Sequence, residues 1–228
     1  MSAGATRGRR RSLRLLAALA GAPGACAPVQ GETVQAPADV QQVVLTVDSG
    51  SVTLLGAPLG ARVRIDREAR AFPSTRGFHE KQNGGVLTIN ARCGGAPGCR
   101  VDHVLRIPPH VAVVVQLRNG DVELGGLEGD VQVDVGLGKI TGSGLRSGSV
   151  DVRTEGGGID LIFAAAPRQV TANAAAGDVS LRVPAGRYRC DLDQAAAGEL
   201  GVTCDPNASA TISASTGVGK LRIRGTQR

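Results

Sequence analysis

Hydrophobic and polar positions along this chain recur in a short phrase: a glycine, a branched aliphatic residue two positions later, and usually another aliphatic two positions after that. Alternation of apolar and polar residues is typical of β-strands that bury one face. Repetition at nearly constant spacing predicts a repeat fold, in which neighbouring units stack to bury their apolar sides. The phrase occupies residues 120–124, 129–133, 148–152, 157–161 and 177–181, and a looser form occupies 50–54, 198–202 and 219–223.

The spacing of the glycines defines the size of the repeating unit. Glycines at 120, 138, 157, 177, 198 and 219 follow one another at intervals of 18 to 21 residues. Each unit has room for two short strands, and no window after residue 27 shows a helical period. Glycine suits the corners between strands because it adopts positive φ without a steric penalty. The pattern predicts an all-β, single-stranded β-solenoid (β-helix) of about eight short coils over residues 42–228.

The first part of this domain is less regular. Strand-like alternation is found at residues 43–47, 61–65, 86–89 and 104–107. Residues 28–41 are polar, contain prolines and show no period, so we expect a flexible linker there. The domain organisation expected from the sequence is therefore a leader over 1–27, a linker over 28–41 and a solenoid domain over 42–228.

Composition agrees with a narrow core. The chain has 33 glycines, three phenylalanines, one tyrosine and no tryptophan, too few aromatic rings for a broad globular core. Residues 1–27 combine five arginines, a short apolar run and small residues, which is typical of an export signal; a basic cytoplasmic N-terminus is the alternative. Without those arginines the net charge falls from +6 to +1, which argues against nucleic-acid binding. No later apolar run is long enough to span a membrane.

Five cysteines divide into two pairs and one remainder. Cys93 and Cys99 flank a turn that contains glycine and proline, and Cys190 and Cys204 flank a stretch without alternation. In an exported protein these pairings are the simplest disulfide framework, although four cysteines permit three connectivities, and four reduced thiols are the alternative. Cys26 follows the apolar run of the leader, where a lipoprotein carries its acylated cysteine. It is either acylated or removed with the leader.

Acidic residues near the glycines raise the possibility of a calcium site. Asp121 and Asp130 lie nine residues apart, and residues 157–161 match part of a calcium-binding nonapeptide repeat. Lys139 and Ser149 replace the acid in successive half-units, so a solvated face of alternating charge is the preferred interpretation. We expect neither a resident metal nor a cofactor.

Two further groups of residues are candidates for a catalytic or ligand-binding site. Asp151 and Asp160 could form a carboxylate pair for glycoside cleavage, but the chain lacks the aromatic platforms that usually hold sugar rings, and exposed aspartates are the simpler interpretation. His79, His103 and His110 share no metal-ligand spacing, so we expect them on the surface or in loops. The sequence therefore favours a protein that is not an enzyme.

The chain resembles a known family over about residues 42–225. The matching phrases lie at 104–108, 119–122, 125–131, 177–188 and 216–221. They are similar to those of the putative adhesin family of bacterial envelope proteins, a β-solenoid domain of unknown function. The resemblance implies the fold and an envelope location, and it brings no catalytic residues to carry over.

The resulting functional hypothesis is a non-enzymatic scaffold or adhesin-like binding module, located outside the cytoplasm and either lipid-anchored in the cell envelope or secreted. We expect an envelope or cell-surface partner, contact with a membrane only through a lipid anchor, and self-association through exposed terminal coils. One alternative is an envelope-stress sensor or regulatory accessory domain that binds peptides or a membrane partner. A polysaccharide-cleaving enzyme is the third.

Overall fold

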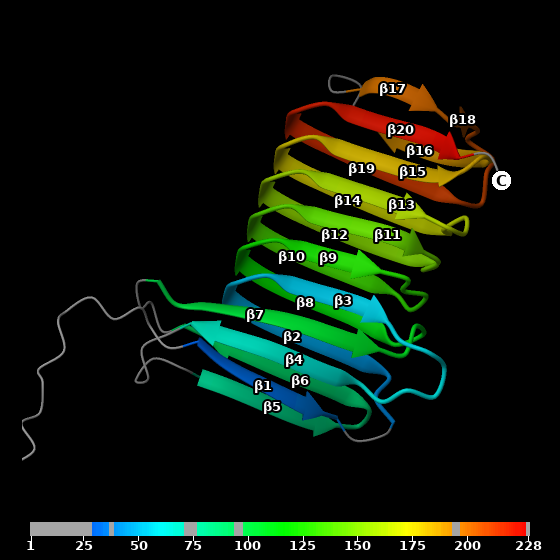
Figure 1. Cartoon of the computed structure of the whole chain (residues 1–228). Helices are drawn as coiled ribbons and strands as arrows, with labels where there is room; N and C mark the ends of the chain where they lie inside the picture. Colours follow the sequence, from blue (N-terminus) through cyan, green and yellow to red (C-terminus); the bar gives the residue numbers. More distant parts are fainter. Residues whose placement is uncertain (1–28, 37–38, 71–76, 94–97, 193–196, 227–228) are drawn as a thin grey trace, which may run out of the picture.

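The computed structural model describes residues 29–36, 39–70, 77–93, 98–192 and 197–226. This part of the chain is all-β, with 20 strands in two ten-stranded sheets and no helix (Figure 1). Consequently no helix in the described ranges could cross a membrane. The expected leader, including Cys26, lies outside these residues.

The two sheets share one continuous hydrophobic core. In spatial order the first sheet contains β1 (Val29–Gln35), β4 (Arg64–Arg70), β7 (Arg100–Ile107), β3 (Val52–Gly56), β9 (Val122–Gly125), β11 (Ile140–Leu145), β13 (Ile159–Phe163), β15 (Val179–Pro184), β20 (Leu221–Thr226) and β17 (Ala197–Gly201). The second contains β18 (Thr203–Cys204), β16 (Arg187–Leu192), β19 (Thr211–Val218), β14 (Gln169–Ala176), β12 (Ser149–Gly156), β10 (Val131–Leu137), β8 (Ala112–Asn119), β2 (Gln42–Ser49), β6 (Val86–Arg92) and β5 (Gly77–Asn83).

Six segments of the chain form a regular stack. Each contributes one strand to the second sheet and then one to the first, and the six follow the same order in both sheets. All pairings within this stack are parallel. We call these segments the repeats; they comprise residues 42–56, 112–125, 131–145, 149–163, 169–184 and 211–226.

Two longer excursions interrupt the repeats and cover the two ends of the stack. The N-terminal excursion, residues 57–111, places β6 and β7 outside β2 and β3, with β4 and β5 added antiparallel beyond them. The C-terminal excursion, residues 185–210, places β16 and β17 outside β19 and β20. Figure 1 shows the result at the C-terminal end, where the red β20 lies beneath the orange β17.

Each excursion contains one disulfide. Cys93, directly after β6, is joined to Cys99, directly before β7, with 5.6 Å between their Cα atoms. Cys190 of β16 is joined to Cys204 of β18, with 5.5 Å between Cα atoms. These are the two pairings expected from the sequence. Because both lie outside the repeats, they constrain the ends of the stack.

Glycines form a ladder along one corner of the stack. Each has φ between +137° and +158°, and a Cβ added to any of the last five would overlap the carbonyl oxygen of the ladder glycine one repeat earlier. Only glycine meets both requirements, because it tolerates positive φ and presents no Cβ. The ladder consists of Gly50, Gly120, Gly138, Gly157, Gly177 and Gly219. The unit expected to open at Gly198 is not part of it, since that residue lies in β17 of the excursion.

Two boundaries differ from those expected. The segment assigned to a linker contains β1, which pairs antiparallel with β4 over seven residues from Val29 to Gln35. The strand expected at residues 61–65 begins only at Arg64 and continues to Arg70. β1 lacks an alternating apolar pattern because it is an edge strand, stabilised by backbone pairing more than by side-chain burial.

Candidate functional site

The parallel register of the second sheet aligns outward-facing side chains into continuous rows. We call the outward surface of β2, β8, β10, β12, β14 and β19 the polar face. One row consists of Thr46, Gln116, Asp134, Arg153, Asn173 and Ser215. The next consists of Val44, Val114, Gln132, Asp151, Thr171 and Ser213. Side chains between these positions point into the core, as the two-residue period of a strand requires.

The polar face is hollowed along the strand ends that lead to the glycine ladder. A hollow of about 500 Å³ lies between Arg153, Glu155, Asn173 and Ser215, and it extends to Asp134. A second hollow, of about 270 Å³, adjoins it at Asp134. Small residues line part of each depression, Gly136 in the smaller one and Ala175 and Gly217 in the larger one. Together the hollows extend across all six strands of the polar face.

Side chains on the polar face form ion pairs and hydrogen bonds with one another, and solvent reaches these contacts. Arg153 lies 3.0 Å from Asp151, two residues away on the same strand, and the Ser215 hydroxyl donates to Asn173 Oδ1 at 2.9 Å. Exposed ion pairs of this kind contribute little to stability, because water screens them. Their donors and acceptors can therefore exchange partners with a bound ligand. The arrangement is suited to hydrogen bonding along an extended surface.

The outward face of the first sheet offers a smaller hollow. It has a volume of about 140 Å³ and lies between Glu123, Thr141 and Asp160. Arg182 is 3.5 Å from Asp160, and across the same face Arg222 is 3.2 Å from Asp178. The two faces therefore differ in the extent of their depressions, and the polar face is the better candidate for a binding surface.

The structure does not bring Asp151 and Asp160 together. Asp151 lies on β12 in the second sheet, whereas Asp160 lies on β13 in the first. Their side chains pair with Arg153 and Arg182 respectively, each on its own sheet. Since the core separates the two faces, these carboxylates cannot flank one glycosidic bond.

Aspartates that follow the ladder glycines hold one repeat to the next. Asp121 Oδ1 accepts a hydrogen bond from the backbone N–H of Lys139 at 2.8 Å, and Asp178 Oδ1 accepts one from Lys220 at 2.9 Å. The bond from Lys220 lowers the pKa of Asp178, and Arg222 lowers it further. No group of three His, Cys, Asp or Glu side chains in the described ranges could hold a metal. These aspartates therefore serve as structural caps.

Of the three histidines, His103 contradicts the expected surface position. It lies on β7 with 1% of its surface exposed, and its Nδ1 donates to the carbonyl oxygen of Val101 at 3.3 Å. Burial lowers the pKa of His103 to about 4, so the ring is neutral at physiological pH. His79 and His110 are exposed, on β5 and in the turn before β8. His103 is inward because it occupies the same alternate positions as Val101 and Leu105.

A buried arginine links the two sheets at the N-terminal end, and sequence analysis missed it. The Arg67 side chain, from β4 in the first sheet, is only 3% exposed. Its Nε lies 3.2 Å from Glu32 of β1, and its Nη1 lies 2.5 Å from Glu80 of β5 in the second sheet. The guanidinium also stands 4.7 Å from the ring centroid of Phe78. These contacts compensate the charge, which is required for a buried arginine.

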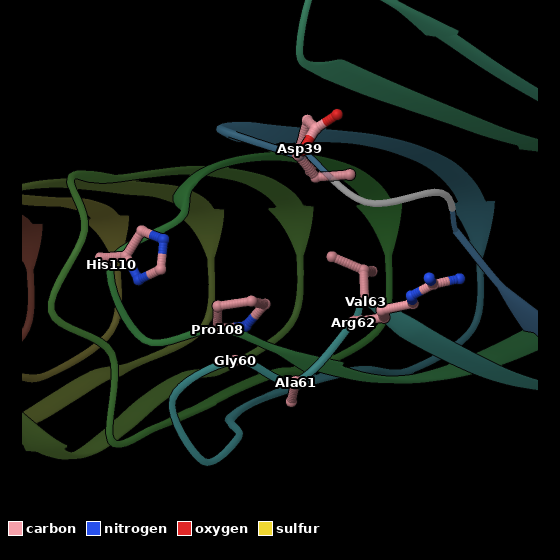
Figure 2. A pocket seen from close by; sticks show the side chains of 8 residues that line it. Asp39, Gly60, Ala61, Arg62, Val63, Pro108 and His110 are labelled. Atoms are coloured by element: carbon pink, nitrogen blue, oxygen red, sulfur yellow. The ribbon is translucent and has the colours of Figure 1, made fainter.

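A cavity of about 250 Å³ lies beside the N-terminal excursion (Figure 2). Val63 and Pro108 form part of its wall, and Asp39, Arg62 and His110 supply its polar groups. In Figure 2, His110 and Arg62 lie on opposite sides of the opening and the Asp39 carboxylate points away from both. These polar groups do not point toward a common centre, so the cavity does not form a polar binding site.

Comparison with known proteins gives a likeness of fold. No family model matches the chain, and no curated protein sequence matches it. Among solved structures, a putative cell adhesion protein from Clostridium sporogenes is similar with a TM-score of 0.50 and 12% identity, covering 88% of this chain and 100% of that one.

Two other solved structures are similar at lower scores. A putative adhesin from Bacteroides fragilis has a TM-score of 0.34 and 10% identity, covering 87% of this chain and 97% of that one. A putative lipid binding protein from Parabacteroides distasonis has a TM-score of 0.33 and 12% identity, covering 85% and 96%. This chain shares its fold with the putative cell adhesion protein from Clostridium sporogenes.

Proposed function

We propose that this protein is a non-enzymatic binding module of the bacterial cell envelope, built as a β-solenoid whose coils each place one strand in each sheet. The observation that carries the proposal is the polar face, where six parallel strands in register align hydrogen-bonding side chains beside two adjoining hollows. A rigid row of shallow contacts suits an extended partner on a cell surface, with affinity gathered from many weak interactions.

The disulfides support an extracytoplasmic location, which this function requires. Two disulfides in a chain of this size are typical of proteins that fold in an oxidising compartment. Export through the leader of residues 1–27 would deliver the protein there. Acylation at Cys26 would then hold it at the membrane, with the polar face available to an envelope or cell-surface partner.

The test places bulky charge on the polar face. Labelled protein would be titrated against isolated envelopes of its own host, comparing the native chain with Thr171→Arg/Ser213→Arg. Both residues are half-buried neighbours in the second row of the polar face. We expect a loss of binding of about tenfold or more, because long side chains would block the surface on β14 and β19.

The matched control carries the same change on the other sheet. Thr53→Arg/Thr141→Arg adds two arginines on either side of Glu123 on the outward face of the first sheet. This variant should bind as the native chain does, provided circular dichroism and thermal unfolding show both variants folded. Equal binding by all three proteins, or a loss confined to the control, would contradict the polar face as the binding surface.

A further inference from the structure

Two neighbouring strands of the polar face carry no charge. β14 and β19, each eight residues long, contain no acidic or basic side chain. On one side of them, β12 carries Asp151, Arg153 and Glu155. On the other side, β16 pairs with the first half of β19 and carries Arg189 and Asp191. We call the outward hydrogen-bonding side chains of β14 and β19 the uncharged strip. It consists of Gln169, Thr171, Asn173, Thr211, Ser213 and Ser215.

The uncharged strip is a regular grid of short side chains. The parallel register sets each of its residues on β14 directly beside one on β19. Neighbouring strands lie about 4.8 Å apart, and alternate residues along a strand lie about 6.7 Å apart. All of these residues except Gln169 are half-buried. Side chains already held by their neighbours lose little freedom when a ligand binds, which favours a surface of many weak contacts.

The strip offers hydrogen-bond donors and acceptors together. A hydroxyl both donates and accepts, and an amide supplies one acceptor atom and two donors. The Ser215 hydroxyl donates to Asn173 Oδ1, and within the described ranges the Nδ2 group of Asn173 has no hydrogen-bond partner. Both residues line the hollow of about 500 Å³. A ligand that enters this hollow therefore meets an available donor in a half-buried position.

These properties select among the kinds of partner found in a cell envelope. A charged group loses hydration when it is covered and requires an opposite charge, which the strip itself does not supply. A peptide or protein partner usually depends on aromatic or aliphatic anchors seated in pockets. The strip has no large apolar side chain. A partner rich in hydroxyl groups can donate and accept at each contact, so it needs neither a charge nor an apolar anchor.

We propose that the uncharged strip binds a neutral glycan, a polymer of uncharged sugars that lies over β14 and β19. This inference rests on the proposed function, because it names the ligand class of the polar face. The strip has no aromatic ring on which a sugar could stack, so each sugar contributes little and several must bind in succession. Single sugars therefore bind weakly, and affinity rises with the length of the glycan.

The first experiment identifies the class of ligand in isolated envelopes of the host. Labelled protein would be titrated against untreated envelopes, envelopes oxidised with periodate, which cleaves the vicinal diols of sugars, and envelopes digested with protease. Glycans released from the envelopes by mild acid would be separated on an anion exchanger and used as competitors. We expect periodate to weaken binding about tenfold or more and protease to leave it unchanged. The unretained, neutral fraction should compete, and longer fragments should compete better.

The other outcomes separate this inference from the proposed function. Failure of the untreated envelopes to bind the protein would contradict both. Binding that protease abolishes and periodate spares would overturn the glycan and leave the binding module intact. Competition by the retained, acidic fraction alone would overturn the neutral character of the ligand.

A matched pair of variants tests the position of the site. Asn173→Asp keeps the acceptor for the Ser215 hydroxyl but exchanges the free amide donor for a charge of nearly the same size. Asn90→Asp makes the same change at a half-buried asparagine of β6, in the second sheet but outside the polar face. We expect Asn173→Asp to weaken competition by the neutral fraction about tenfold, because a covered charge would lack a partner.

The control should bind the neutral fraction as the native chain does. Thermal unfolding monitored by circular dichroism would establish that both variants are folded. Unchanged binding by Asn173→Asp, or an equal loss in both variants, would overturn the assignment of the glycan to the uncharged strip.

Discussion

His103 shows how one buried side chain can control the response of the protein to acid. Burial lowers its pKa to about 4, against an ordinary value of 6.5 in the unfolded chain. Between these values the unfolded chain binds more protons, so stability is complete above about pH 6.5 and falls as the pH approaches 4. The shift corresponds to about 3 kcal/mol.

This dependence can be measured by urea unfolding between pH 7 and pH 4.5. The native chain should lose stability over that range, and His103→Gln should lose less, because its side chain does not titrate. Parallel pH profiles for the two proteins would contradict the assignment of this effect to His103.

The burial of His103 and Arg67 could have been predicted from the sequence, although no motif indicated it. His103 and Arg67 both occupy inward positions of their strands, flanked two residues away by buried apolar side chains such as Leu105 and Ala69. The alternation of inward and outward positions along each strand was enough to place both side chains in the core. The sequence could not identify the partners of Arg67, because Glu32 and Glu80 approach it from different strands and different sheets.

Among the elements, the corners have the strictest requirement for residue type. At Gly138, an added Cβ would overlap the Gly120 carbonyl oxygen, and the φ of +150° is unfavourable for any other residue. Gly138→Ala should therefore cost about 2–4 kcal/mol of unfolding free energy. Gly31→Ala is the control, since an added Cβ there meets nothing within 4 Å. Equal effects of both changes in denaturant unfolding would argue against the ladder.

The aspartate caps give a second prediction at the corners. The backbone N–H of Lys220 is the largest cause of the lowered pKa of Asp178, ahead of Arg222. An NMR titration should find this pKa below 3.8 in the native chain, and Arg222→Gln should restore only part of the difference. Full return to the ordinary value in that variant would show that the ion pair, not the backbone, is the main cause.

The elements that sequence analysis located are those with repeated chemistry. All six ladder glycines follow from the spacing of 18 to 21 residues or the looser phrase, and the strands after them follow from alternation. The N-terminal β1 and the excursion strands β16 and β18 were not located, because they lack an alternating apolar pattern, whereas the phrase at 198–202 overlaps β17 but was assigned to a repeat. The polar face could be anticipated as a solvated face, but its hollows depend on register between repeats.

In the whole molecule, chain order and spatial order differ at both ends. Residues 211–226 are the last repeat in sequence, yet they lie between the fifth repeat and the C-terminal excursion. Amide exchange should therefore be as slow in β19 and β20 as in β12 and β14, and fastest in the outermost strands β1, β5, β17 and β18. Exchange measured by mass spectrometry on peptic fragments would test this. Rapid exchange of β19, as expected of a frayed terminus, would contradict the observed strand order.

That inverted order has a consequence for how the protein is made. During synthesis β16 and β17 leave the ribosome before β19 and β20, although the later strands occupy the gap between them and the body. Until residues 211–226 have been synthesised, β16 and β17 lack the strands with which they pair in the folded protein. Synthesis of β19 and β20, and not merely of the first repeats, is therefore the step that completes this end of the fold.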